Sequence, residues 1–561
     1  MRKIRFAAFV VSACALLPVV AQTVPPAVKT AEASIDGEKI RAHVKFLADD
    51  LLEGRAPGLR GSELAAKYIA TQFALYGLKP GGDNGTYLQQ VSFVGMKVIP
   101  EKTHFSLVPK RPEGQMAIDL YSIDLKYGDD YTVSNATLTP SVDVDAPIVF
   151  VGYGVTAPEF GWDDYAGVDV KGKVIMCIVG DPPSDDPKFF GGKALTYYGR
   201  WTYKFEQAAR KGAVGALIIH RTDLASYGWD VVKNSFASEK TYLRDNKDPQ
   251  LEAASWIQLD VAKQIFKSSN MDLDAEFAAA GKKGFKAVQL PVRLQAHVES
   301  VVRPFKSPNV VGVLPGANVA EKKVDQAVMY TAHFDHLGFV EGMKGDNIYN
   351  GAADNATGCG MILELARAWA ESGLKPAHSV IFAAVTAEEQ GLLGSEYLGQ
   401  HPPVPAGQIA LDINYDMILP IGVPKQVNVN GAQRTDFYPA VEATAKRFDF
   451  QIVPDARPEA GTYYRSDHFS LSRVGIPAFS VEVGELYEGH DLEWGKKKFN
   501  DFEEHDYHNF SDNYHEDWDF SGNAKLDRFG MELGWEAVAA PHSISWKRGD
   551  EFEAARVASE K

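Results

Sequence analysis

Imidazole and carboxylate side chains recur in the second half of this 561-residue chain, each time beside a short apolar segment. His333 and Asp335 follow directly on one such segment, and Asp354 lies in a glycine-rich loop before a helical pattern. The pair Glu388–Glu389 follows a second apolar segment, and Asp416 follows a third. Each feature is weak by itself, since Glu-Glu pairs and glycine-rich turns are common at protein surfaces. Their occurrence in order at the ends of predicted strands indicates one shared site.

These side chains are suited to binding zinc. Imidazole nitrogen and carboxylate oxygen are ligands that Zn²⁺ accepts, and no thiolate accompanies them. Two ions about 3.5–4 Å apart need one carboxylate to bridge them. A further carboxylate must stay off the metals to take a proton from the bound water, so the pair Glu388–Glu389 can supply one ligand and one base. Asp335 can accept the free ring N–H of His333 and orient that imidazole.

Alternating strands and helices must position these groups. Strands are predicted at Val328–Thr331, Val380–Val385, Ile409–Ile413 and Ala478–Val481. Helices are predicted at Met361–Trp369 and, as the last clear helix, at Asn523–Val538. The alternation predicts an α/β fold with a mixed central sheet flanked by helices. Ligands bind at the carboxyl ends of strands in such sheets, so we expect the polar groups to converge there.

The N-terminal part is predicted to be helical. Residues 22–33, rich in Pro, Ala, Thr and Val, are typical of a flexible leader. The next helix is expected to have an apolar face formed by Ile40, Val44, Leu47 and Leu51. A second helix is expected to begin with Ser62 as its N-cap and to end at Gly77. These helices belong to a segment that we place at residues 34–95.

Short β-like runs dominate residues 96–304, and one amphipathic helix is predicted there at Tyr203–Arg210. This pattern predicts a separate β-rich domain with few helices. It would be inserted before the α/β region at residues 305–545.

A basic start and an apolar run from Phe6 to Ala21 predict a signal peptide at residues 1–21, cleaved after Ala21. The run is too short for a membrane span. We therefore expect an exported protein, periplasmic or secreted. Val11–Cys14 also fits a lipoprotein signal that would anchor Cys14, but the apolar run continues well past that cysteine.

Composition narrows the range of partners. The formal net charge of −16 argues against nucleic acid or an anionic membrane as the main partner. Cys177 and Cys359 lie in apolar segments and are expected to be buried small side chains rather than a disulfide.

Taken together, the motifs resemble the co-catalytic dizinc aminopeptidases, a family that includes bacterial leucyl aminopeptidases and glutamate carboxypeptidase II. The matching segments are Gly54–Gly58, His333–Gly338, Gly351–Gly358, Thr386–Ser395, Tyr415–Met417, Ser466–Phe469 and Tyr507–Asp512. The β-rich part resembles the protease-associated domain that many members carry. Its likeness lies in Ile148–Val151, Gly172–Val174 and Lys204–Ile219.

The resemblance implies two zinc ions per chain, held by His333, Asp354, Glu389, Asp416 and His508. One ion would take His333 and Asp416, the other Glu389 and His508, and Asp354 would bridge them. Glu388 would be the general base. Ala353 is a departure, because the family often has a second acidic residue there. The absence of that acidic residue is expected to weaken the contacts that hold the metal-binding loop, but not to remove a metal ligand.

Five histidines compete for the last ligand position: His468, His490, His505, His508 and His515. We favour His508, since its loop resembles the final histidine-containing loop of the family. His468 is the alternative, and otherwise we expect it to be a hydrogen-bonded group beside Asp467.

The expected function is therefore an exopeptidase, most simply an aminopeptidase that removes N-terminal residues from peptides with a metal-activated water. A carboxypeptidase is an alternative that Arg465 would favour, because a substrate carboxylate needs a cationic partner. Two further alternatives share the scaffold. A glutaminyl-cyclase-like acyltransferase would work with one zinc ion, and a non-catalytic receptor would be favoured by a loss of ligands, whereas all five are present here. The sequence specifies neither the oligomeric state nor the preferred side chain.

Overall fold

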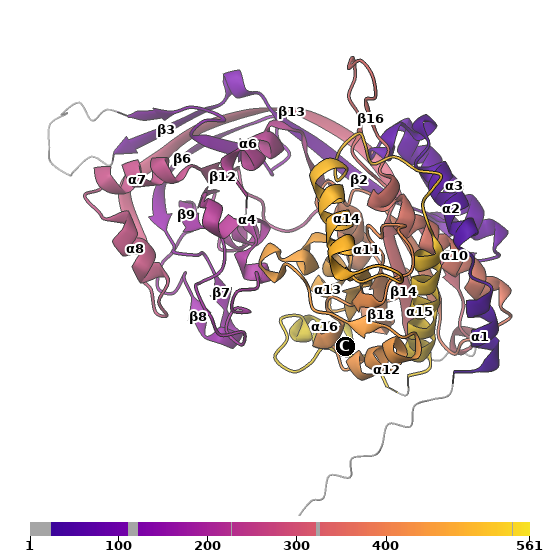
Figure 1. The fold of residues 1–561 in the computed structure, drawn as a ribbon. Helices are drawn as coiled ribbons and strands as arrows, with labels where there is room; N and C mark the ends of the chain where they lie inside the picture. Colours follow the sequence, from indigo (N-terminus) through magenta and orange to yellow (C-terminus); the bar gives the residue numbers. More distant parts are fainter. Residues whose placement is uncertain (1–23, 110–121, 226, 321–325, 541) are drawn as a thin grey trace, which may run out of the picture.

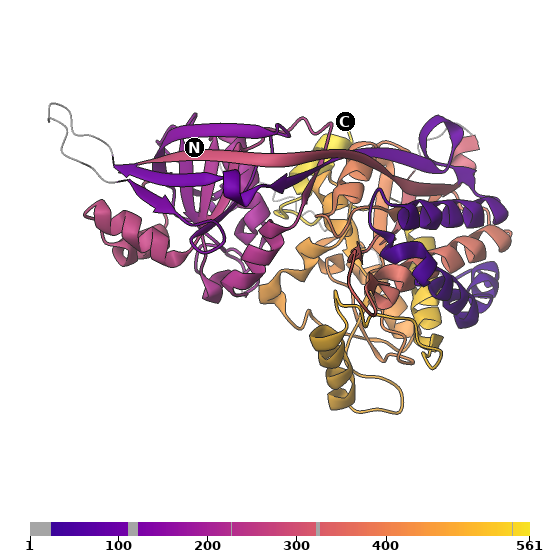
Figure 2. The same ribbon diagram turned by 90° about the horizontal axis from the view of Figure 1, so that it is seen from above.

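The computed structural model describes residues 24–109, 122–225, 227–320, 326–540 and 542–561, which form two lobes (Figure 1). The expected signal peptide, with Cys14, lies outside these residues. A single strand of 27 residues, β13 (Val288–Leu314), runs through both lobes, as Figure 2 shows from above. Fifteen strands of the described residues join one sheet through it.

The α/β lobe contains the second half of β13 and four further strands of the main sheet. These are β14 (Ala327–His333), β17 (Val380–Val385), β18 (Ile409–Asn414) and β21 (Ala478–Ser480). The order is β21-β18-β14-β17-β13. The first four run parallel, and β13 is antiparallel to β17. The predicted mixed central sheet is confirmed, with strand ends within two residues of the predicted ones.

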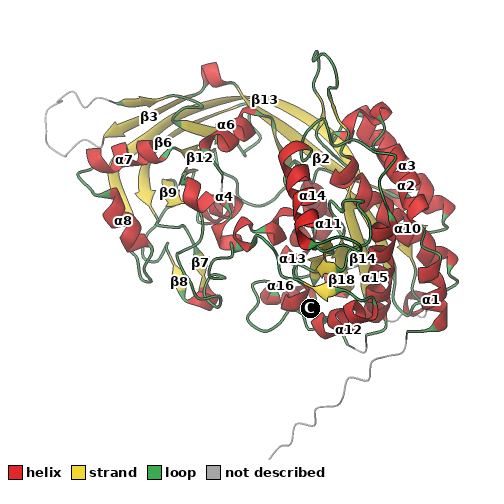
Figure 3. Cartoon of the chain, viewed as in Figure 1, coloured by secondary structure: helices red, strands yellow, loops and turns green. Residues whose placement is uncertain are grey.

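Helices cover both faces of this sheet (Figure 3). One face packs against α2 (Gly37–Leu47), α3 (Arg60–Leu75), α10 (Thr357–Glu371), α12 (Tyr438–Arg447) and α15 (Ser521–Val538). The other packs against α11 (Leu393–Gln400) and α13 (His468–Arg473). Strand β14 explains this division, because Val328 and Tyr330 point to the first face while Met329 points to the second.

Smaller elements complete this lobe. They are α1 (Pro26–Ala33), β1 (Lys79–Pro80), α9 (Ala317–Ala320), β15 (Gly338–Phe339), β16 (Ile348–Tyr349), β19 (Gln426–Asn428), β20 (Gln451–Ile452), β22 (Glu482–Val483), α14 (Leu492–His505) and α16 (Glu553–Ser559). No helix of the described residues combines the length and the apolar character that a membrane crossing requires.

The β-rich lobe is built on the first half of β13. Its strands are β3 (His104–Pro109), β4 (Ile123–Leu125), β5 (Tyr131–Ser134), β6 (Ser141–Phe150), β7 (Thr156–Ala157), β8 (Trp162–Asp163), β9 (Val174–Ile178), β10 (Gly215–Ile219) and β12 (Ala253–Ile257). Strand β2 (Leu88–Val98) pairs with residues 300–310 of β13, and β11 (Lys240–Leu243) pairs with β2. Strands β6, β9, β10 and β12 run parallel. The predicted boundaries at residues 96 and 304 fall inside β2 and β13.

This lobe contains more helix than the sequence predicted. Besides α4 (Trp201–Arg210), the described residues form α5 (Thr222–Ala225), α6 (Trp229–Ala237), α7 (Leu259–Ser268) and α8 (Leu273–Ala280). The expectation of one helix was wrong, because α7 buries a regular apolar face of Val261, Ala262, Ile265 and Phe266. That spacing was present in the sequence.

Predictions near the two ends of the chain also need correction. Residues 26–33 form helix α1 rather than a flexible leader. Leu51 is 77% exposed because α2 ends at Leu47 and the backbone then turns through positive φ at Glu53 and Gly54. Ser62 is not an N-cap, since α3 begins at Arg60. Helix α16 follows the helix expected to be last.

Candidate metal centre

Three strand ends place the polar groups at one edge of the α/β sheet. His333 is the last residue of β14, Glu388 and Glu389 follow β17, and Asp416 follows β18. Because these strands are parallel neighbours, their carboxyl ends meet. Asp354 is buried in the loop between β16 and α10. These residues occupy the sheet edge at which the sequence placed them.

Asp354 lies between two imidazoles. Its Oδ1 is 3.2 Å from His333 Nε2, and its Oδ2 is 3.2 Å from His508 Nε2. Asp416 Oδ1 is 3.2 Å from His333 Nε2, and Glu389 Oε2 is 3.1 Å from His508 Nε2. The five predicted ligands thus form two groups of three that share Asp354. Ligand atoms of His333, Asp354 and Glu389 lie within 4.8 Å of one another, and such a cluster of nitrogen and oxygen donors fits zinc.

Burial and neighbouring charges compete in this cluster. Burial alone would lower the pKa of His508, but Asp354 and Glu389 raise it to about 10. Burial and the charge of Asp354 would raise the pKa of Glu389, but His336 and His508 lower it to about 2. The imidazoles hold the pKa of Asp354 well below its usual range. The carboxylates therefore carry negative charge while largely removed from water, as metal ligands must.

Glu388 differs from its neighbour Glu389. Its Oε2 is 4.0 Å from His333 Nε2, whereas both the Glu389 and the Asp354 carboxylates approach an imidazole more closely. Burial raises the pKa of Glu388 well above its usual range, and Glu389 and Asp416 add to that effect. A carboxyl group beside the cluster, with a raised pKa, has the properties of a general base or acid.

Asp335 makes contacts other than the predicted one. Its carboxylate is 3.9 Å from His333 Nδ1, and the nearer acceptor for that ring nitrogen is the Asp335 carbonyl oxygen at 3.2 Å. The carboxylate instead accepts backbone N–H groups from Glu388 at 3.1 Å and Glu389 at 3.3 Å. Asp335 therefore orients His333 through its main chain, and its side chain fixes the loop that carries the two glutamates.

Arg55 connects the N-terminal helices to the site, a role that the sequence did not reveal. It is 1% exposed. Its guanidinium donates to the carbonyl oxygens of Phe334, Asn350 and Gly351 at 2.5–2.8 Å, and to that of Leu47. Phe334 lies between His333 and Asp335, while Asn350 and Gly351 begin the Asp354 loop. One planar side chain thus holds both metal loops.

Further contacts support the predicted ligands. Asp512 accepts the backbone N–H groups of Ala353 at 2.8 Å and Asp354 at 3.0 Å, which secures the loop despite the missing acidic residue at position 353. Ser466 donates its hydroxyl to Asp416 Oδ2 at 2.6 Å. His336 Nδ1 lies 2.7 Å from Glu389 Oε1. Ser466, Asp512 and His336 all lie within the motifs that suggested the site.

The competing histidines lie apart from this cluster. Among the described contacts, His468 makes none with a predicted ligand. Its buried ring packs edge-on against Tyr463 at 4.7 Å, and burial lowers its pKa to about 3. His490 stacks on Trp494, and His515 packs against Trp518. His508 is the candidate whose ring reaches Asp354 and Glu389.

A cleft of about 460 Å³ lies beside the cluster. Glu388, Glu389 and Tyr507 line it from the α/β lobe, and Arg200 and Tyr242 line it from the β-rich lobe. The predicted base therefore faces a space that both lobes enclose and that can hold a small peptide.

Sequence comparison identifies the part of the chain that forms this centre. Residues 309–526 match the model of peptidase family M28. The match covers these residues, called the M28 segment below, and not the rest of the chain. The expected relation to co-catalytic zinc peptidases is therefore confirmed for the M28 segment, which contains every predicted ligand.

Individual relatives resemble shorter stretches. A "Probable zinc metalloprotease" of Pyricularia oryzae is 34% identical over 122 residues, which are 22% of this chain and 23% of that protein. "Leupeptin-inactivating enzyme 1" of Streptomyces exfoliatus is 33% identical over 149 residues, or 26% and 31% of the two chains. The matches span under a third of these relatives.

A solved structure resembles the chain over a greater length. The aminopeptidase from Aneurinibacillus sp. strain AM-1 covers 91% of this chain and 96% of its own, with 19% identity and a TM-score of 0.48.

Proposed function

We propose that the chain is a dizinc aminopeptidase that hydrolyses the first peptide bond of peptides. The observation that carries this proposal is the position of Asp354, whose two carboxylate oxygens each face a different imidazole. One ion would be held by His333, Asp354 and Asp416, and the other by Asp354, Glu389 and His508. Membership of the M28 segment in a peptidase family supports the same chemistry.

The side chains have separate roles in the proposed reaction. Zinc, when bound, would polarise the scissile carbonyl and supply a water of lowered pKa. Glu388 would take a proton from the attacking water and return it to the departing amine. Asp335 would keep Glu388 in place through its hydrogen bonds to the glutamate loop. Acidic groups around the site, among them Asp416 and Glu388, favour a substrate that presents an ammonium group.

Metal analysis and a substrate panel test the proposal together. Purified protein should contain close to two zinc ions per chain, and chelation should abolish cleavage of amino-acyl reporters. Dipeptides with a blocked N-terminus should be inert, whereas those with an amidated C-terminus should still be cleaved. Full activity after exhaustive metal removal would refute the proposal. Cleavage of N-blocked peptides alone would indicate a carboxypeptidase, and cyclisation of N-terminal Gln would indicate an acyltransferase.

We also propose that the chain is exported, on the basis of its basic start and apolar run at residues 1–21. N-terminal sequencing of the mature protein should begin at Gln22. A lipid-modified Cys14 as first residue would replace this proposal with membrane anchoring.

A further inference from the structure

Two histidines and an aspartate form a row across three strands of the β-rich lobe. His297 lies in β13, and the strand register places it opposite His104 of β3 and opposite Asp143 of β6. Directly opposed residues of antiparallel strands point to the same face of a sheet, with Cβ atoms about 4.5–5.5 Å apart. The three side chains are therefore neighbours on one face. Figure 1 shows β3 and β6 in the lobe that does not contain β14 and β18, the strands of the metal centre.

This row lies on the solvent-facing side of the sheet. Leu294 and Ala296 of β13 point into the core of the lobe, so the residues that alternate with them point outwards. The side chain of His297 is 37% exposed and that of Asp143 is 84% exposed. His104 is exposed as well. An ion from solution can therefore reach the row without opening the fold.

Asp143 determines which nitrogen of His297 is free to bind an ion. Its Oδ1 lies 2.7 Å from His297 Nδ1. An ionised carboxylate only accepts hydrogen bonds, so Nδ1 carries the hydrogen, and Nε2 of the neutral ring keeps its lone pair. Histidines that bind metals are usually held in this way, with the second ring nitrogen donating to a carboxylate or carbonyl oxygen. His297 is thus oriented as a ligand through Nε2.

His104 supplies a second imidazole beside it. The two ring centroids are 6.4 Å apart, and the ring planes are inclined at 28°. Two imidazoles that share one tetrahedral ion have ring centroids roughly 5 Å apart, given metal–nitrogen bonds of about 2.0–2.1 Å. Because His104 is exposed, a rotation of its side chain can close this difference.

The charges around the row favour a cation. Arg293 is paired with Asp145 at 2.7 Å, and Lys102 is paired with Glu299 at 2.6 Å. Among the residues that the structure describes, no lysine or arginine forms an ion pair with Asp143. The row therefore keeps one carboxylate charge beside two imidazoles, and a divalent cation bound there would not approach an unpaired basic group of these strands.

We propose that His104 and His297, with Asp143 holding His297, bind one divalent transition-metal ion at a site separate from the metal centre. Imidazole nitrogen suits Zn²⁺, Ni²⁺ and Cu²⁺, whereas Mg²⁺ and Ca²⁺ prefer oxygen ligands. Water would complete the coordination. Because the two imidazoles come from different strands, the ion would join β3 to β13 and stabilise the outer part of the β-rich lobe. The site does not depend on the proposed peptidase function.

Calorimetric titration of untagged, zinc-loaded protein with Ni²⁺ tests the proposal. Wild type should bind about one Ni²⁺ ion per chain beyond its zinc, and its zinc content should be unchanged afterwards. H104Q and H297Q should each weaken this binding by about 10-fold or more, because each loses a ligand. D143N should weaken it by about 10-fold, as the loss of a group that orients a metal-binding histidine does. Cleavage of amino-acyl reporters by H104Q should equal that by wild type.

H505Q is the matched control. His505 is also exposed beside a carboxylate, with its Nε2 4.0 Å from Glu504 Oε2, but among the described ring contacts it faces no second imidazole. Its replacement should leave Ni²⁺ binding unchanged. The Tm gives a second readout, because an ion that binds only the folded chain stabilises it. Ni²⁺ should raise the Tm of wild type and of H505Q more than that of H104Q.

Two results would overturn the proposal. One is that zinc-loaded wild type binds no Ni²⁺ beyond the metal centre. The other is Ni²⁺ binding that either H104Q or H297Q leaves intact, because the ion would then lie elsewhere on the surface.

Discussion

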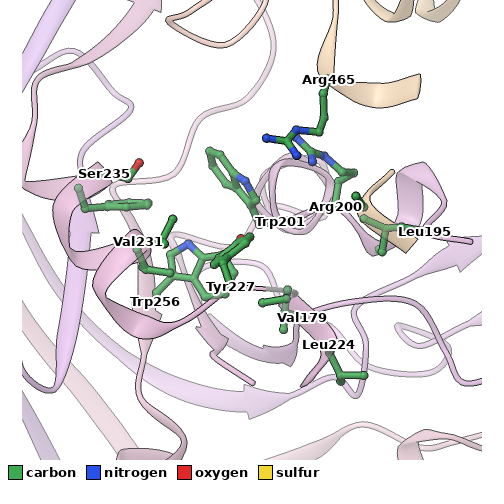
Figure 4. A pocket seen from close by; sticks show the side chains of 15 residues that line it. Val179, Leu195, Arg200, Trp201, Leu224, Tyr227, Val231, Ser235, Trp256 and Arg465 are labelled. Atoms are coloured by element: carbon green, nitrogen blue, oxygen red, sulfur yellow. The ribbon is translucent and has the colours of Figure 1, made fainter. Parts of the chain in front are cut away.

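The two lobes differ in the side chains that lie near the carboxyl ends of their parallel strands. In the α/β lobe, β14, β17 and β18 end at His333, Glu388–Glu389 and Asp416, a cluster suited to cations. In the β-rich lobe, Val179 follows β9 and lines a cavity with Arg200 and, from the other lobe, Arg465 (Figure 4). The cluster in the α/β lobe follows the rule that ligands bind beyond strand ends. The rule predicts where a site lies, and the side chains there determine the charge of its ligand.

Buried carboxylates behave differently in the two lobes. Burial would raise the pKa of Glu389, but the imidazoles beside it lower that pKa to about 2. Asp181 in the β-rich lobe accepts hydrogen bonds from Thr196 and is attracted by the charge of Lys204, yet burial raises its pKa to about 7. Burial thus acts in the same direction in both lobes, and the neighbours decide the outcome.

The largest expected effect comes from removing the proposed base. E388Q keeps the shape of the side chain but cannot accept a proton, so kcat should fall by about 10²- to 10⁴-fold. Mass spectrometry should still find about two zinc ions per chain. E389Q is the matched control, because it changes a neighbouring glutamate that is a predicted ligand and should lower metal content. Wild-type turnover by E388Q would exclude it as the base.

The second prediction separates the two histidines that compete for the last ligand position. H508A should bind about one zinc ion fewer per chain and lose most activity, since its ring contacts Asp354 and Glu389. H468A should retain both ions, because the ring of His468 packs on Tyr463 rather than on a predicted ligand. Normal zinc content in H508A with a loss in H468A would reverse the assignment.

The third prediction compares two buried arginines at opposite ends of one sheet. R55K keeps the positive charge but loses the planar set of donors that binds Phe334, Asn350 and Gly351, and should cost about 2–4 kcal/mol of stability. Zinc affinity should fall as well, because both metal loops lose their support. The measurement is zinc affinity by competition with a chelator, together with Tm.

R556K provides the control for R55K. Arg556 is also buried, and it donates to the carbonyl oxygen of Ile409 at the amino end of β18, away from the metal edge. Its replacement should lower Tm but leave zinc affinity unchanged. Similar zinc loss in both variants would mean that Arg55 acts through general stability alone.

The sequence contained enough information to predict the α/β sheet and the sheet edge of the site. Strand ends such as that at Val385 follow from long apolar runs, which tertiary packing seldom overrides. The chemistry of the donors at those ends could also be recognised. Hydrogen bonds between loops could not be predicted from the sequence, because they form only when segments that are distant in the chain come together in the fold. Arg55 and the three carbonyl groups that it joins near the site are 279–296 residues apart.

The β-rich lobe was predicted less completely for a physical reason. Most of its helices are short, so they offer little periodic pattern, as the eight residues of α8 (Leu273–Ala280) do. The apolar face of α7 is the exception, because its spacing was present in the sequence. The approach of Arg200 to Arg465 was also hidden, because the two residues lie in different lobes and line the same cleft only in the folded chain. Arg465 by itself suggested carboxylate recognition, and Arg200 gave no signal in the sequence.

The smallest expected effect tests the buried carboxylate of the β-rich lobe. The pKa of Asp181 is about 7 in the folded chain and about 3.9 when unfolded. Folding therefore favours the protonated form. This contribution to stability is fully present below pH 3.9 and is lost as the pH rises through about 7. D181N cannot titrate, so from pH 5 to pH 8 the wild type should lose about 2 kcal/mol relative to the variant. The difference in Tm between the two proteins, measured at both pH values, checks this sign. A constant difference would mean that Thr196, rather than burial, controls the ionisation of Asp181.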